Sequence, residues 1–177
     1  MDVNAPIALV GASYNTLDQA VRDYQSVWGA RHDGDFHHTS VAVLTKDSAG
    51  TSHLERNNST AKHLEWGGAL LGAALFVLAP TTGIEILPRV GLSGAGALVD
   101  HFRHNSDPED LAAVARLLEV GACGLVAVIV NRRSQAITSL LTHAGGKWSV
   151  DMPWGDLEEE LSKDFARPRS GMVLVAT

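Results

Sequence analysis

The chain has a single cysteine, Cys123, so it cannot form an internal disulfide or a cysteine-based zinc site. It also lacks an excess of positive charge. Its 14 lysines and arginines stand against 20 aspartates and glutamates, which gives a formal net charge of −6. A negative surface repels the phosphates of nucleic acids and anionic lipid headgroups. We therefore expect a reducing compartment and no nucleic-acid partner.

The first ten residues, MDVNAPIALV, lack the lysines and the long apolar run of a secretory signal. Long uncharged runs are scarce as well, and the longest extends from Trp66 to Ile84. A helix rises about 1.5 Å per residue, so residues 66–79 would cover about 21 Å, less than the roughly 30 Å hydrocarbon core of a bilayer. Pro80 then favours a turn. These features predict a cytoplasmic protein and disfavour one continuous membrane-spanning helix.

Small residues recur at helical spacing in this run and in a second segment that follows it. Gly68 and Gly72 are four residues apart, with Ala73 beside them, and Gly91 and Ala95 repeat the spacing. Small side chains at this interval let two helices approach backbone to backbone, in a bilayer or in an oligomer. We predict a glycine-rich helical hairpin in which these five residues make the assembly contacts. A loop relaxed by its glycines and insertion into a membrane are the alternative interpretations.

The rest of the chain carries strand and helix patterns. Apolar or alternating runs predict strands at residues 7–14, 38–45, 51–56, 123–130 and 147–152, and apolar residues at helical spacing predict helices at 15–29, 107–121, 132–143 and from 156 onward. Asn15 is the expected cap of the first helix, with Asp18 in its first turn. Asp107, followed by a proline and acidic residues, is typical of a helix start.

The order strand, helix, strand, strand, insertion, helix, strand is that of a split βαβ sandwich. We therefore predict an α+β fold: a ferredoxin-like split βαβ sandwich with an inserted glycine-rich helical hairpin at about residues 61–104. Residues 1–146 form this domain, and residues 147–177 form a C-terminal helix and tail. Helices cover one face of such a sheet, so a second subunit or the inserted hairpin should cover the other.

Eight histidines suggest a metal site, and their best local cluster is Asp100, His101, His104 and Asp107. His101 and His104 would share one face of a helix. However, the spacing is not that of the HExxH zinc motif, and helix ends attract histidine and aspartate for purely electrostatic reasons. We predict no metal and no cofactor.

Motifs of catalysis are also missing. The glycines from Gly91 to Gly96 have the order GxxGxG rather than GxGxxG, and no P-loop lysine follows them. The serines lie outside any GxSxG setting. Three consecutive glutamates at 158–160 are expected on a solvated helix face. We therefore predict no catalytic residues. We expect the tryptophans at positions 28, 66, 148 and 154 to pack at subunit interfaces, with the protein core or a membrane interface as the alternatives.

Several segments together resemble a known family. They are VAVLTKDSAG, GGALLGAAL followed by a proline, a glycine-rich return, and CGLVAVIV. In this order, over roughly residues 7–143, they resemble the bacterial family called domain of unknown function 1269. The resemblance implies a predicted membrane protein, because of the glycine-rich segment, and implies no activity. Glu85 and Arg89 inside the hairpin depart from a bilayer segment.

The sequence therefore favours a non-enzymatic, self-associating protein of unknown biochemical role. We expect a homo-oligomer in which the glycine-rich hairpin mediates assembly or membrane association, with a stress-related function. The alternative is a small-molecule-binding sensor or enzyme that uses an open face of the sheet.

Overall fold

Five strands form one sheet in the computed structural model of the chain, which describes residues 6–30, 38–49, 51–59, 74, 95–130 and 133–155. The elements are β1 (Pro6–Tyr14), α1 (Leu17–Ala30), β2 (His38–Lys46), β3 (Ser52–Ser59), α3 (Ala95–Asn105), α4 (Pro108–Val120), β4 (Cys123–Val130), α5 (Ser134–Thr138) and β5 (Gly146–Pro153). The strand order is β3-β2-β4-β1-β5, and all neighbours run antiparallel. The predicted α+β fold is confirmed.

The centre of the sheet is formed by the two strands that are apolar on both faces. β1 pairs with β4 from Ile7 opposite Val130 to Tyr14 opposite Cys123. Every residue of β4 and all of β1 after Pro6 are buried. A strand that is apolar on both sides has to be covered on both sides.

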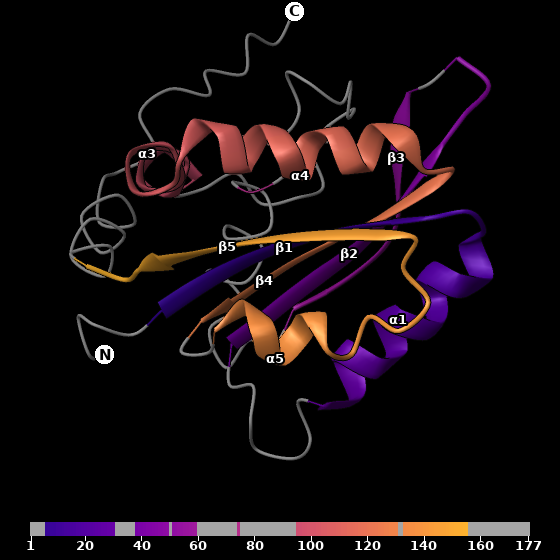
Figure 1. Ribbon diagram of the computed structural model, residues 1–177, viewed down its shortest axis with the longest axis horizontal. Helices are drawn as coiled ribbons and strands as arrows, with labels where there is room; N and C mark the ends of the chain where they lie inside the picture. The colour runs from indigo at the N-terminus through magenta and orange to yellow at the C-terminus, as the bar shows by residue number, and fades with distance from the viewer. Residues whose placement is uncertain are drawn as a thin grey trace, which may run out of the picture.

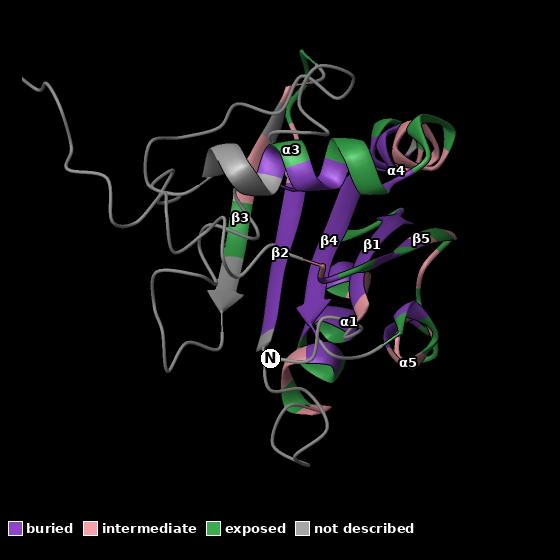
Figure 2. Ribbon diagram, turned by 90° about the vertical axis from the view of Figure 1, so that its left-hand side faces the viewer, coloured by how far each residue is buried: buried purple, intermediate pink, exposed green. Residues whose placement is uncertain are grey.

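Helices cover both faces of the sheet (Figure 1). α1 and α5 lie on one face, and α3 and α4 lie on the other, each over its own cluster of buried side chains. Figure 2 shows the buried central strands between these two helical layers. The helix predicted at 107–121 is α4, and it lies on the face opposite α1 rather than beside α1. α3, which overlaps the predicted insertion, covers the same face as α4.

α4 can pack on this face because glycines of the sheet lie beneath its apolar stripe. A Cβ atom at Gly11 would lie 2.5 Å from Val114 Cγ1, and one at Gly124 would lie 2.6 Å from Leu118 Cδ2. The helix thus occupies space that larger strand residues would fill. Val114, Ala115 and Leu118, three residues of the predicted stripe, are all buried.

The starts of α1 and α4 differ in how well the sequence predicted them. The Asp107 side chain accepts a hydrogen bond from the Glu109 backbone N–H at 2.8 Å, which confirms it as the cap of α4. In α1 the capping side chain is Thr16 rather than Asn15. The Thr16 hydroxyl accepts from the Gln19 backbone N–H at 3.4 Å.

α5 is shorter than the helix predicted over 132–143. It ends at Thr138, and the Leu140 N–H then donates to the Ile137 carbonyl in a tight turn. The Lys147 ammonium donates to the carbonyl oxygens of Thr138 at 2.7 Å and Leu141 at 3.3 Å, and so binds carbonyls that a longer helix would pair. The chain is therefore free to turn into β5 through a loop at 139–145.

The predicted glycine-rich hairpin falls mostly outside the described residues. Four of its five assembly residues lie there: Gly68, Gly72, Ala73 and Gly91. The fifth, Ala95, is the first residue of α3. Ala74 is 0% exposed and belongs to the same core cluster as α3 and α4. At this residue, the glycine-rich segment packs onto the domain.

The strand predicted at 147–152 is β5, which pairs with β1 from Pro153 opposite Pro6 to Gly146 opposite Ser13. It is therefore part of the main sheet. The helix predicted from residue 156 onward lies outside the described residues. Within the described ranges, no helix is long and apolar enough to cross a membrane.

Candidate functional site

A carboxylate, Asp23, is buried on the side of α1 that faces the sheet, with its side chain 0% exposed. The Tyr14 hydroxyl donates to Asp23 Oδ2 at 3.1 Å. The His143 backbone N–H donates to the same oxygen at 3.0 Å. Burying a carboxylate without hydrogen-bond donors is costly, so these two donors make the position tenable.

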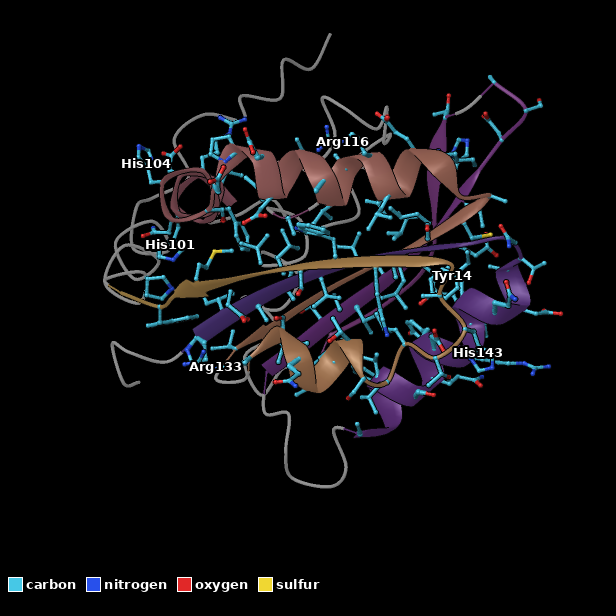
Figure 3. The ribbon with its side chains drawn as sticks, in the orientation of Figure 1. Tyr14, His101, His104, Arg116, Arg133 and His143 are labelled. Atoms are coloured by element: carbon cyan, nitrogen blue, oxygen red, sulfur yellow. The ribbon has the colours of Figure 1, made fainter. Side chains whose placement is uncertain are left out.

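The His143 imidazole is the third group on Asp23. Its Nδ1 lies 2.7 Å from Asp23 Oδ1 and 3.2 Å from the Thr142 hydroxyl, and its side chain is 38% exposed. Figure 3 shows His143 on the loop after α5, at the same end of the sheet as Tyr14. A carboxylate at this distance orients the imidazole by accepting a hydrogen bond from Nδ1. The cluster therefore fixes the ring against α1.

The Tyr14 phenol stays a hydrogen-bond donor to this carboxylate. Burial holds its pKa far above the ordinary value, and the negative charge of Asp23 and the hydrogen bond to it act in the same direction. Across the part of the chain that the structure describes, no group of three His, Cys, Asp or Glu side chains could hold a metal ion. The cluster joins β1, α1 and the loop that leads into β5.

The predicted histidine cluster is not brought together as one site. His101 is 8% exposed, and its Nε2 lies 2.9 Å from the Pro153 carbonyl oxygen. His104 Nδ1 lies 2.7 Å from the Asp100 carbonyl oxygen. Asp107 caps α4. Figure 3 shows the two rings on different sides of α3. Each residue thus has its own local structural partner.

A shallow groove of about 510 Å³ lies where the C-terminal half of α4 meets the ends of β1 and β5. Ala113, Arg116 and Leu117 of α4 line one side, and Ser13 and Gly146 line the other. The groove combines a guanidinium, a hydroxyl and an apolar wall. The alternative predicted from the sequence was a ligand on an open face of the sheet. Helices cover both faces of the described sheet, so a ligand would instead bind in this groove at the edge of α4.

β5 forms one edge of the sheet, and it exposes Trp148. The indole is 46% exposed, and its N–H donates to Asp110 Oδ1 at 3.2 Å. Of the other tryptophans predicted at interfaces, Trp154 is buried and Trp28 is partly buried in the core. Trp66 lies outside the described residues. Trp148 is the predicted interface tryptophan that the structure places at the surface.

Cys123 should be nearly unreactive in the native protein. It is a free, buried thiol at the start of β4, and burial raises its pKa, with a smaller contribution from the negative charge of Glu55. Because the thiolate is the reactive form, we expect an aromatic disulfide reagent to modify native Cys123 at least about 100-fold more slowly than the urea-unfolded chain. The colour released at about pH 8 measures both rates. Equal rates would contradict the burial.

Sequence reasoning missed the Tyr14–Asp23–His143 cluster. One signal was present, because Asp23 lies three residues after Ala20 and four before Val27 and so falls on the apolar stripe of its helix. A charge on such a stripe indicates a buried partner. Nothing local identified that partner, since His143 is 120 residues away.

Comparison of the chain with protein-family models, with curated proteins and with solved structures gave no match. The resemblance to the domain of unknown function 1269 family therefore stays a prediction, and the function is inferred from the geometry of the chain itself.

Proposed function

We propose that this chain is a non-enzymatic protein that associates with copies of itself. The observation that carries the proposal is Trp148, a tryptophan 46% exposed on the edge strand β5. Tryptophan is enriched at the centres of protein interfaces, where burying the indole stabilises the complex. An edge strand also presents backbone N–H and C=O groups that a second strand can pair with.

The glycine-rich segment contributes a second contact in this proposal. Its small residues, Gly68, Gly72, Ala73, Gly91 and Ala95, are suited to close packing between helices. Ala74, a described residue of this segment, is buried in the core of the domain. The proposed assembly is cytoplasmic and stress-related, and association of the same segment with a membrane is the competing outcome.

We also propose that the sheet is ferredoxin-like. Without β3, the strand order is β2-β4-β1-β5, and α1 and α5 connect these strands on one face. This is the order of a split βαβ sandwich. In this interpretation β3 extends one edge of the sheet, and the insertion that ends in α3 and α4 covers the second face.

The mass of the protein in detergent-free solution tests self-association. The chain has a mass of 18.8 kDa, and we expect light scattering to give at least about twice this value at high micromolar concentration. Gly72→Leu should shift the mass toward the monomer, because a leucine holds neighbouring backbones apart. Gly29→Leu adds the same bulk at an exposed position of α1, where an added Cβ meets no atom within 4 Å, and should have no effect.

Two results would overturn the proposal. A parent protein that is monomeric in solution but floats with lipid vesicles would indicate membrane association instead. A monomer that also stays out of the lipid fraction would exclude both modes of association.

A small-molecule-binding role is the second candidate, and the groove beside α4 favours it. Its volume of about 510 Å³ falls in the range of ligand pockets. Arg116 would bind an anionic group, and Leu117 would pack on an apolar one. A metabolite screen that follows thermal unfolding tests this role. No stabilisation by any compound would count against it.

A further inference from the structure

The outer edge of β5 is open in the described part of the chain: β5 pairs with β1 on one side, and no other described strand pairs with it. Its side chains alternate between the two faces. Lys147 and Asp151 contact α5, through the Thr138 carbonyl and through Ser134, so they lie on the α5 face. Val150 belongs to the cluster under α4 and lies on the other face.

An antiparallel partner that is a second copy of β5 would meet this edge across a two-fold axis. If the axis is perpendicular to the sheet, each side chain keeps its own face, so the two opposed residues differ by an even number of positions. The axis then passes midway between the two copies of one residue. The identity of that residue determines every other pair across the two strands.

The sequence of β5 is self-complementary about Ser149. With the axis there, Lys147 lies opposite Asp151 of the second copy, and Trp148 lies opposite Val150 of the second copy. Symmetry makes each pair twice. Opposite charges and aromatic–β-branched pairs both stabilise antiparallel strands. An axis through Trp148 or through Val150 would lose both charge pairs.

We infer that a second copy of this chain pairs antiparallel with the outer edge of β5, across a two-fold axis at Ser149. The inference rests on the proposed self-association and names its surface. Lys147 and Asp151 can keep their hydrogen bonds to α5. Opposite charges attract over several ångströms, so the pairs across the two strands do not require these side chains to move. The indole of Trp148 becomes buried against the second copy.

On the α4 face, the helices leave room for this pairing. α4 packs over both β1 and β5, and Figure 2 shows α4 and α5 on either side of the β5 edge. Neighbouring strands are about 4.8 Å apart, so an α4 axis midway between β1 and β5 places the two α4 helices about 10 Å apart. Packed helices lie at this distance. Ala113 and Leu117, both partly exposed, line the groove between α4 and β5 and would meet there.

A cysteine at position 149 tests the register directly. The two copies of residue 149 would lie opposite each other, with Cα atoms about 5 Å apart, which is within the range of a disulfide. We expect full-length Ser149→Cys to form a covalent dimer under mild oxidation, with at least about tenfold more product than Ser26→Cys at an exposed position of α1. The parent, with Cys123 buried, controls for the native thiol.

Charge reversal provides an independent test. Lys147→Glu opposes two carboxylates, and Asp151→Lys opposes two ammonium groups, so each variant alone should associate at least about tenfold more weakly. Mixing the two restores opposite charges at both pairs and should give a heterodimer. Circular dichroism of each variant checks that its fold is intact.

The outcomes separate this inference from the proposed function. A parent that is monomeric in solution overturns both. A parent that is oligomeric, with no more cross-linking at position 149 than at position 26, leaves self-association standing and overturns the β5 interface. A disulfide dimer at 149, together with rescue in the mixture, supports both.

Discussion

Replacing Asp23 with alanine should lower the free energy of unfolding by about 3 to 5 kcal/mol. The substitution removes the acceptor of three donors: the Tyr14 hydroxyl, the His143 backbone N–H and the His143 ring. The hydroxyl and the amide would then be buried without a partner, and each unsatisfied group costs about 1 to 3 kcal/mol. Urea unfolding followed by circular dichroism measures the loss.

Two further variants locate the source of that loss. Tyr14→Phe removes one donor and leaves Asp23 with His143, so it should cost only about 1 kcal/mol. Asp18→Ala, at an exposed position of the same helix, should change stability by no more than about 0.5 kcal/mol. If Asp23→Ala cost less than about 1 kcal/mol, the cluster would not be the structural anchor that its geometry indicates.

Replacing Gly121 with alanine should cost about 2 to 3 kcal/mol. Gly121 ends α4 where the chain turns into β4, with ordinary backbone angles of φ −80° and ψ 156°. An added Cβ would lie 2.7 Å from the Cys123 carbonyl oxygen and 3.0 Å from the Tyr14 backbone nitrogen. Backbone atoms cannot rotate aside as a side chain can, so the end of α4 has to shift away from the sheet.

Gly29→Ala is the matched control for this substitution. Gly29 lies in the last turn of α1, and an added Cβ meets no atom within 4 Å. Alanine is the better helix former, so this variant should gain about 0.5 to 1 kcal/mol. Melting temperatures of the two variants should therefore move in opposite directions. A loss at position 29 as large as that at position 121 would contradict the close backbone contacts at Gly121 as the cause.

The buried cluster also bears on the edge strand. The loop that carries His143 leads directly into β5, and the Gly145 N–H in that loop donates to the Ser13 carbonyl at 2.9 Å. Asp23 holds this loop against α1, so it helps to determine where β5 begins. In this arrangement the cluster is a positioning device for the edge on which we place the second copy.

Local sequence patterns predicted most of the elements. The uniformly apolar run of β4, the alternation in β2 and its pairing with β3, and the Asp107 cap of α4 all follow from periodicity and capping chemistry. These features depend on residues within a few positions of each other. The predicted C-terminal end of α5 was wrong, because Lys147 of the next strand donates a hydrogen bond to the Thr138 carbonyl at the end of the helix.

The sequence by itself determined the α+β class, the Asp107 cap of α4 and the small residues on which the assembly prediction depends. Tertiary structure alone decided which face α4 covers, which charge is buried and which tryptophan is exposed. The physical reason is that each of these depends on close contact between distant segments. Val114 packs into the space above Gly11, His143 contacts Asp23, and Trp148 lies on the strand that ends the sheet.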